Sequence, residues 1–324
     1  MTHSTVHDLY QQMTLPVIAA PMFTITSPEL VIAQCASGII GSLPAMNAKH
    51  SNELATWLTY IDDNLTQLKR EQPQQNIAPY AVNLIVHASN DRIEKDLEVC
   101  AQHKVPLIVT SLRAPDRVVK AVQSWGGKVF HDVTTFRHAE KALEAGVDGL
   151  VLVCAGAGGH AGTLSPFALL GEVRRIFDGP VALSGAMSRG QDIAAALAMG
   201  ADFAYMGTRF IASQEANVTD DYKKMIVDGA AKDILYTPHF TGVPGNYLKP
   251  SIVRAGMDPD NLSETDNSQA GMDATDSNVW EKVWGAGQGV GNIDSIQSVR
   301  DIVSQLRDDY VKASTTLAER FAKS

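Results

Sequence analysis

The chain of 324 residues is poor in cysteine, in charged side chains and in long apolar runs. Its three cysteines, Cys35, Cys100 and Cys154, are widely spaced and form no CxxC pair, so neither a disulfide framework nor a zinc site is indicated. No apolar run approaches the roughly 18 residues that a membrane span requires. We therefore expect a soluble globular protein with reduced cysteines and no bound metal.

Positive charge is also scarce, because 36 acidic residues outnumber 27 lysines and arginines and leave a net charge of −9. This balance argues against nucleic acid or an anionic membrane as a partner, although it does not exclude a small anionic substrate. The first residues, MTHSTVHDLYQQMTLP, lack the basic stretch and apolar core of a signal peptide. The sequence therefore predicts a cytoplasmic location.

Short β-rich runs alternate along the chain with segments of helical spacing. The expected strands are Val17–Ala20, Ile39–Ser42, Tyr80–Ile85, Pro106–Thr110, Lys128–His131, Gly149–Val153, Val181–Ser184 and Phe203–Met206. The expected helices include Pro28–Ser37, Asp91–His103, Pro115–Ser124, Thr135–Ala145, Pro166–Ile176 and Gln191–Met199. Eight such units in about 210 residues predict an α/β fold, a (β/α)8 TIM barrel. The rival, a doubly wound dinucleotide fold, would place GxGxxG after the first strand, where this chain reads APMFTI.

The alternation stops after the eighth strand, so residues 1–212 are predicted to form the barrel. Residues 213–290 contain HFTGVPGNYLKP and the polar run DPDNLSETDNSQAGMDATDSN, and they are interpreted as a helical insertion or cap with a mobile surface loop. Residues 291–324 include Ile296–Phe321, which predicts one or two amphipathic helices that pack on the barrel.

The stretch Val147–Phe167 runs an apolar strand into a glycine-rich turn that carries His160. Glycines let a backbone approach a flat or phosphorylated ligand closely, and an imidazole beside them can supply or remove a proton near neutral pH. The turn therefore indicates a functional site with His160 as the catalytic residue. The alternative is a glycine-rich barrel corner with a surface histidine.

The active site of a TIM barrel lies at the carboxyl ends of its strands, so the residues just past each strand are the candidates. They are Ala20, Pro21, Met22, Asn83, Asp132, Ala157, Gly158, Gly159, His160, Ser184, Gly185, Ala186, Met206, Gly207 and Thr208. Small residues after the seventh and eighth strands let backbone amides point at a phosphate. Singly, each glycine could be a tight turn, and Asn83 a cap or core hydrogen bond. Together they outline a flavin mononucleotide (FMN) site, with the phosphate at one end and the isoalloxazine ring across the barrel mouth.

Nearly the whole chain resembles the nitronate monooxygenases, formerly called 2-nitropropane dioxygenases, which are FMN-dependent barrels. The motifs that carry the resemblance are PVIAAPMF, YAVNLIV, VFHDVTTFRHAEKALEAGVDGLVL, AGAGGHAG, VALSGAMSRGQDIAAALAMGADFAYMGTRFIAS and WGAGQGVGNID. The run from Ser184 to Phe210 is the most specific, although sister flavoenzymes share it. The resemblance implies that His160 is the active-site histidine. It also implies flavin-ring contacts from Pro21, Met22 and Asn83, and phosphate contacts from Gly185, Ala186, Gly207 and Thr208.

Two positions depart from the family pattern. Many relatives have an acidic residue or cysteine where this chain has Ala157, and some have a lysine near the flavin where it has Asp132. A carboxylate near the N1 and O2 edge of the ring would oppose the anionic reduced flavin, unless it faced the ribityl chain or paired with His131. Asp132 therefore leaves the electronic tuning of the flavin open.

The resemblance implies oxidative denitrification of alkyl nitronates or nitroalkanes with O2, giving carbonyl compounds and nitrite. His160 and Tyr247 are the predicted substrate contacts, although Tyr247 could equally be a core residue. Two alternatives stay open: an NAD(P)H:quinone or enoyl reductase on the same FMN barrel, and a barrel that binds a phosphate ligand without redox chemistry. A homo-oligomer is also left open.

Overall fold

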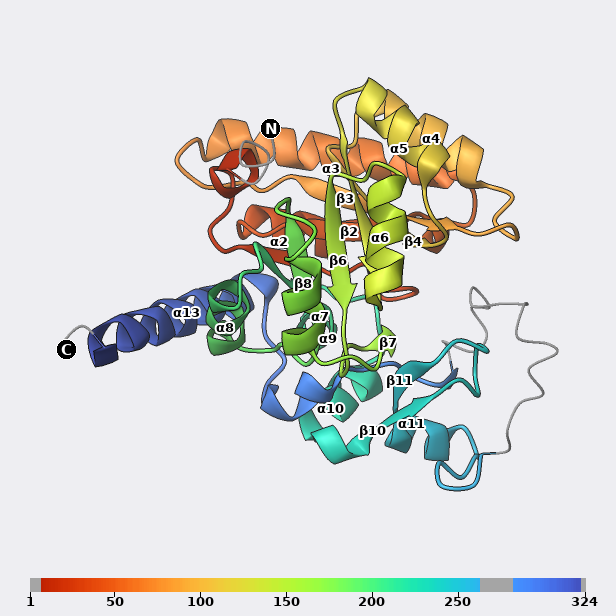
Figure 1. Ribbon diagram of the computed structural model, residues 1–324, viewed down its shortest axis with the longest axis vertical. Coiled ribbons are helices and arrows are strands. Elements are labelled where there is room, and N and C mark those ends of the chain that lie inside the picture. Colours follow the sequence, from red (N-terminus) through yellow and green to blue (C-terminus); the bar gives the residue numbers. More distant parts are fainter. Residues whose placement is uncertain (1–6, 263–281, 322–324) are drawn as a thin grey trace.

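The computed structural model describes residues 7–262 and 282–321 and contains one eight-stranded parallel sheet (Figure 1). Its strands are β1 (Val17–Ala19), β2 (Gly41–Pro44), β3 (Tyr80–Val86), β4 (Leu107–Leu112), β5 (Lys128–Val133), β6 (Gly149–Val153), β8 (Val181–Ser184) and β9 (Phe203–Met206). Their order is β1-β9-β8-β6-β5-β4-β3-β2. The Ala19 amide donates to the Ile40 carbonyl at 2.8 Å, which joins the two ends of the sheet and closes the barrel.

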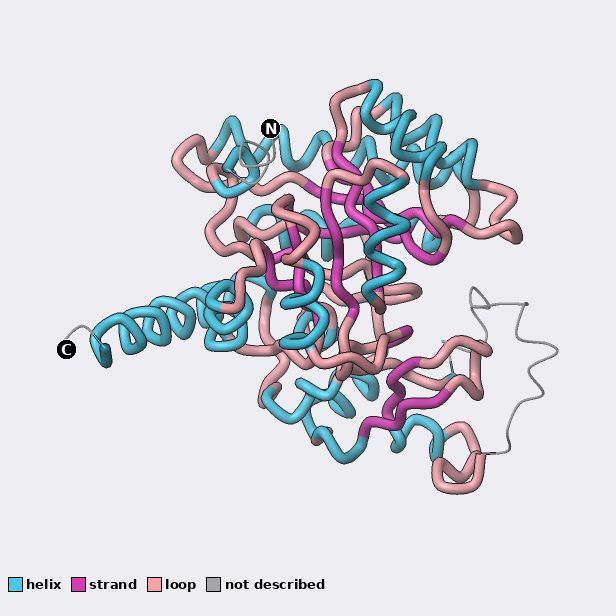
Figure 2. The backbone as a smooth tube through the Cα atoms, viewed as in Figure 1, coloured by secondary structure: helices cyan, strands magenta, loops and turns pink. Residues whose placement is uncertain are grey.

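Each strand is followed by a helix. The helices are α2 (Pro28–Ala36), α3 (Ser51–Glu71), α4 (Ile93–Gln102), α5 (Asp116–Ser124), α6 (Phe136–Glu144), α7 (Pro166–Val173), α8 (Gly190–Ala198) and α9 (Thr208–Ile211). The predicted (β/α)8 barrel is confirmed. Figure 2 shows the strands at the centre of the molecule with helices around them.

The element boundaries differ slightly from those expected. The second strand begins at Gly41 rather than Ile39, because Ile40 pairs only with Ile18 in the closing bridge and the ladder with β3 starts at Gly41. Helix α3, 21 residues long, is not among the helices named from the sequence. It buries a single stripe of leucine and isoleucine and exposes many charged residues, which weakens the apolar signal.

The barrel interior is filled by apolar side chains from alternating strand positions. Phe130 of β5 and Phe203 of β9 lie 6.2 Å apart between ring centroids. A Cβ at Gly149 would lie 2.5 Å from the Phe130 ring, so this glycine leaves the space that the ring fills. Tyr10, from the segment before β1, packs edge-on against Phe203 at 5.4 Å and covers this end of the interior. The opposite end is therefore the one that can open to a ligand.

The segment after β9 adds helix α10 (Asp220–Asp228), strands β10 (Ile234–Thr237) and β11 (Gly245–Leu248), and helix α11 (Lys249–Arg254). Helices were expected here, but the two strands were not. They form a three-stranded antiparallel sheet with β7 (Gly159–His160), the glycine turn of the barrel itself. Most of the polar run 258–278, predicted to be a mobile loop, lies outside the described residues. The cap thus joins the barrel through the turn that carries His160.

The last described element is one helix, α13 (Val299–Phe321), whose first half packs on α8 and α2. The contact with α8 is close, since a Cβ at Gly190 would lie 2.2 Å from the Leu306 carbonyl. Figure 1 shows the second half of α13 extending away from the barrel. Across residues 7–262 and 282–321, the structure contains no helix with the length and apolarity of a membrane span.

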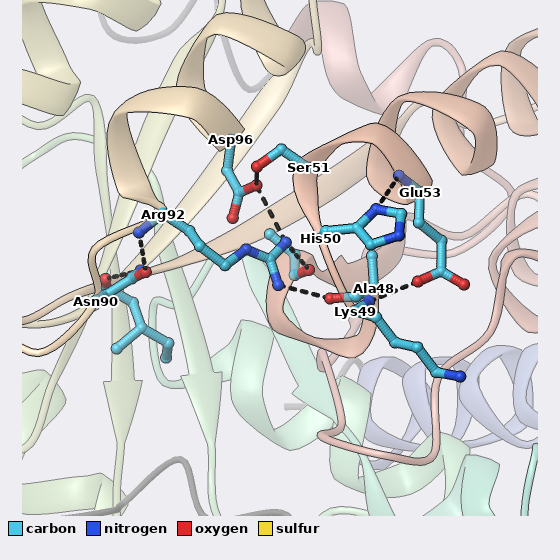
Figure 3. Close-up of polar contacts among 10 residues, drawn as sticks. Ala48, Lys49, His50, Ser51, Glu53, Asn90, Arg92 and Asp96 are labelled. Atoms are coloured by element: carbon cyan, nitrogen blue, oxygen red, sulfur yellow. Dashed lines mark hydrogen bonds and ion pairs between the residues drawn. The ribbon is translucent and has the colours of Figure 1, made fainter.

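The loop after β2 is held by the guanidinium of Arg92 (Figure 3). Arg92 Nη1 donates to the Ala48 carbonyl at 2.6 Å, and Nη2 forms an ion pair with Asp96 at 3.1 Å. Ser51 donates to the same Asp96 oxygen at 2.7 Å, and Asp96 is fully buried. A buried pair with additional hydrogen bonds gives a rigid junction. The junction fixes the loop that carries Met46 toward the mouth of the barrel.

Candidate active site

A cavity of about 600 Å³ opens at the carboxyl ends of the strands, beneath the cap. It brings together twelve of the residues that the sequence singled out: Ala20, Pro21, Met22, Asn83, Asp132, Ala157, Gly158, Gly159, His160, Ser184, Gly207 and Thr208. Its remaining wall is largely apolar and includes Phe23 and Met46 from the barrel loops, Ile85 and Leu112 from the ends of β3 and β4, and Val243 and Pro244 from the cap. The size and lining are typical of a site for a small organic ligand.

None of the described residues that line this cavity is a lysine or an arginine. The titratable side chains on its wall are one aspartate, two histidines and three tyrosines. An anionic group bound here would therefore meet backbone amides, hydroxyl groups and neutral side chains rather than a fixed cation.

A second, much smaller cavity of about 20 Å³ adjoins the first and shares Ala157, Gly158, Ser184, Tyr205, Gly207 and Thr208 with it. The rest of its lining is Gly156, Gly185, Ala186, Met187, Ser188, Gly287 and Gly289. A Cβ at Gly158 would lie 2.8 Å from the Gly287 nitrogen, and one at Gly287 would lie 2.6 Å from the Gly156 carbonyl oxygen. The main chains therefore approach more closely than side chains would allow, and leave a recess walled by backbone.

The corner after β1 is positioned by Asn47, which the sequence analysis did not single out. The Asn47 side chain accepts from the Thr24 amide at 2.9 Å and donates to the Met22 and Thr26 carbonyls at 3.1 and 2.8 Å. These three bonds hold Met22 against the cavity. Asn47 lies 23 to 25 residues after Thr24 and Met22 in the sequence, and no sequence motif links it to this corner.

Asn83, Ser111 and Asp132 form a relay across β3, β4 and β5. The Asn83 Nδ2 group donates to the Val109 carbonyl at 3.1 Å and to Ser111 Oγ at 2.9 Å. Ser111 in turn donates its only proton to Asp132 Oδ2 at 2.6 Å. Burial raises the pKa of Asp132 to about 7, and the hydrogen bond from Ser111 lowers it, so this carboxyl group is unusually easy to protonate.

Asp132 is not paired with its neighbour His131. The His131 ring lies on the other face of the strand, buried, with Nδ1 at 2.8 Å from the Thr110 hydroxyl. Burial lowers the pKa of His131 to about 4, so its ring is neutral at physiological pH. Pairing with His131, one of the two arrangements considered above for an aspartate near a flavin, is therefore excluded.

His160 lines the large cavity and is fixed by the cap. Its strand, β7, pairs with β11, with His160 opposite Gly245. Its Nε2 atom lies 2.8 Å from the Thr241 hydroxyl, which donates to the Val243 carbonyl at 3.1 Å. When the hydroxyl gives its single proton to that carbonyl, it accepts from His160 Nε2–H, and Nδ1 is then the unprotonated ring nitrogen. Burial lowers the pKa of His160 to about 4, so the ring is neutral at physiological pH.

Two predicted site residues, Met206 and Tyr247, line neither cavity. The Met206 side chain packs in the apolar layer between the sheet and its helices, while its carbonyl accepts from the Ala20 amide at 2.9 Å. Tyr247 is fully buried in the cap beside Ile252 and Val283. Its hydroxyl lies 3.5 Å from that of Thr241, the residue that is hydrogen-bonded to His160. Gly185 and Ala186 line only the smaller cavity.

Several lining residues were missed by the sequence analysis. Tyr205, one position before Met206, faces the interior because strand side chains alternate, and a strict alternation count over FAYM would have found it. Ser111 required knowledge of strand register, since it lies beside Asn83 and Asp132 only after folding. Gly287 and Gly289 belong to the motif WGAGQGVG, which was quoted for the resemblance but was not included in the predicted site.

Comparison with known proteins identifies relatives by sequence. The chain is 26% identical to a nitronate monooxygenase from Paraburkholderia phytofirmans over 278 residues, which covers 75% of this chain and 76% of that protein. It is also 26% identical over 240 residues to (3aS,4S,5R,7aS)-5-hydroxy-7a-methyl-1-oxo-octahydro-1H-indene-4-carboxyl-CoA dehydrogenase from Rhodococcus jostii, and spans 64% of that enzyme's length.

Among solved structures, nitroalkane oxidase from Streptomyces ansochromogenes superposes with a TM-score of 0.77 at 22% identity, covering 96% of this chain and 99% of that one. This likeness supports the barrel fold. The model of the nitronate monooxygenase family matches residues 5–309, nearly the entire sequence. The chain therefore belongs to the nitronate monooxygenase family of flavin-dependent oxidoreductases.

Proposed function

We propose that this protein binds FMN and uses O2 to convert alkyl nitronates, or the parent nitroalkanes, to carbonyl compounds and nitrite. The observation that carries the proposal is the joining of a backbone-walled recess to an apolar cavity in which His160 is neutral and fixed. The relationship at 26% identity to a nitronate monooxygenase supports the choice of substrate.

The residues present fit FMN. The recess, where a Cβ at Gly185 would lie 2.9 Å from the Ala155 carbonyl, suits a phosphate held by main-chain groups together with Ser184 and Thr208. Pro21, Met22 and Asn83 would contact the ring, and the cavity is wide enough to take it. When bound, FMN would supply the electron-transfer chemistry. The protein's part is to orient the substrate beside it and to exclude water.

His160 would act as a base toward a nitroalkane. A neutral imidazole cannot attract the nitro oxygens as a cation would, but it can take the α-proton at its unprotonated ring nitrogen. A nitronate has already lost that proton, so its turnover does not need this step. The cap bonds that hold the ring fix the direction of proton transfer.

The first test is the visible spectrum of the purified protein after incubation with FMN, recorded aerobically and then anaerobically with ethylnitronate or NADH. Flavin absorbance that bleaches with ethylnitronate, followed by nitrite release in air, would support the proposal. Rapid bleaching by NADH without a response to nitronate would indicate a quinone or enoyl reductase instead. A colourless protein that takes up no FMN would indicate a barrel that binds a phosphate ligand without redox chemistry.

A further inference from the structure

Asp132 has one carboxylate oxygen satisfied and one that is not. Its Oδ2 atom accepts from Ser111 at 2.6 Å, while Oδ1 is buried and has no hydrogen-bond partner among residues 7–262 and 282–321. The residue lines the large cavity. A buried charge without a cation is costly, and a buried oxygen without a partner is a place where a ligand atom fits.

The relay determines which oxygen carries the proton when Asp132 is neutral. Ser111 Oγ accepts from Asn83 and gives its own proton to Oδ2, so Oδ2 is an acceptor. As long as Ser111 donates to Oδ2, the carboxylic proton of a neutral Asp132 lies on Oδ1, the oxygen without a partner among the described residues. A neutral Asp132 thus offers one O–H donor at the cavity wall, held in place from behind by two residues.

The groups around Asp132 supply no countercharge. Ser111 faces it from β4, and Val151 of β6 is its partner in register. Tyr205 faces it from β9, and burial followed by the charge of Asp132 raises the pKa of that phenol, so Tyr205 stays neutral. The other titratable groups on the cavity wall are histidines and tyrosines, and His131 is bonded to Thr110. Among the described residues, the hydrogen bond from Ser111 favours the carboxylate, and burial, the larger effect, favours the acid.

We propose that Asp132 binds the flavin as a neutral acid, donating a hydrogen bond from Oδ1 to an acceptor atom of the isoalloxazine ring. The inference rests on the FMN site proposed above. The ring presents its N1 and N5 atoms and two carbonyl oxygens as acceptors, and Asp132 lies on β5, across β6 from the recess that suits the phosphate. Some relatives have a lysine here, which is a charged hydrogen-bond donor. This chain would use the neutral carboxylic O–H of Asp132 instead, and that donor is lost when Asp132 ionises.

The test measures the Kd of the apoprotein for FMN by fluorescence quenching at a series of pH values from about 5.5 to 8.5. For the wild type, Kd should rise above a midpoint near pH 7, approaching about tenfold for each pH unit. The phosphate of FMN titrates in the same range, so the reference is Asp132→Asn, which keeps a donor and cannot ionise. The difference between the two profiles isolates Asp132.

A second variant separates this role from a structural one. Ser111→Ala removes the hydrogen bond that lowers the pKa of Asp132, so the midpoint should move to higher pH. A merely structural effect would weaken FMN binding at every pH and leave the midpoint in place. The absorption spectrum of bound FMN should shift with pH in the wild type at the same midpoint and stay constant in Asp132→Asn.

Two results would overturn the inference while leaving the proposed function intact. One is FMN binding by the wild type with the same pH profile as Asp132→Asn, and the other is a midpoint that Ser111→Ala does not move. A protein that binds no FMN at any pH would overturn the proposed function and this inference with it.

Discussion

Asn246 of the cap donates its side-chain amide to the carbonyl of Ala157 in the glycine turn, at 2.6 Å, and both residues are buried. The bond lies beside the pairing of β11 with β7, where Asn246 is opposite Gly159. The cap and the turn that carries His160 are therefore one unit. A substitution that loosens the cap should therefore also disturb the position of His160.

Asn246→Ala should destabilise the protein by about 1–3 kcal/mol, because it leaves the Ala157 carbonyl without its buried donor. Turnover of nitroalkanes should fall more than overall stability alone explains, since His160 loses its fixed direction. Urea denaturation and steady-state kinetics measure the two effects. The matched control is Asn217→Ala at an exposed asparagine of the segment after the barrel. Equal behaviour of the two variants would contradict the coupling.

His160→Asn should separate the two substrates. Without the base, nitroalkane turnover should drop by about 10²–10⁴-fold, whereas ethylnitronate turnover should change only a few fold. For the wild type, kcat/KM with a nitroalkane should be constant above about pH 5 and fall below a pKa of about 4, where His160 gains a proton. His87→Asn, outside the cavity wall, is the control. If His160→Asn retained both activities, His160 would have no catalytic role.

Buried His131 should make the protein sensitive to acid. Its pKa is about 4 in the folded state against 6.5 for an unperturbed histidine, so between these values the unfolded chain binds a proton that the native state does not. The corresponding stability is complete above about pH 6.5 and is lost as the pH falls toward 4, by roughly 2–4 kcal/mol.

The matching variant is His131→Asn, whose side-chain amide can replace Nδ1 as the hydrogen-bond partner of Thr110 but cannot titrate in this range. Its unfolding free energy should depend less on pH between 4 and 6.5 than that of the wild type. Chemical denaturation at several pH values provides the comparison. Parallel profiles for the two proteins would show that His131 is not the group responsible.

Gly287→Ala should damage the phosphate recess. The added Cβ would lie 2.6 Å from the Gly156 carbonyl, so one of the two main chains must move and the recess must change shape. We expect FMN affinity to fall by about tenfold or more, as measured by fluorescence titration. Gly171→Ala is the control, because its Cβ meets nothing within 4 Å on helix α7 and should stabilise slightly. An unchanged Kd for Gly287→Ala would place the phosphate elsewhere.

The barrel could be predicted because each of its parallel strands is a short apolar run between helical segments. Such strands are buried on both faces, so the run itself identifies them without knowledge of their partners. The cap strands β10 and β11 have four residues each. β10 has mixed exposure, and β11, although buried, reads GNYL, which is not an apolar run. The pairing of β11 with Gly159 and His160 depends on residues about 85 positions apart in the chain.

The candidate site, like the fold, could be predicted from the sequence only in part. Because all parallel strands of a barrel end at one mouth, the alternation of strands and helices was enough to gather Pro21, Asn83, Asp132, His160 and Thr208 at one place. The sequence by itself therefore determined the architecture and which strand ends line the cavity.

Only the tertiary structure decided the state of the groups there. The register of β3, β4 and β5 places Ser111 between Asn83 and Asp132, and the cap gives His160 its partner Thr241. Burial then sets the pKa values of Asp132 and His160, since the cost of a charge depends on the solvent that surrounding chain removes. That cost depends on three-dimensional surroundings, which residue types and their spacing do not specify.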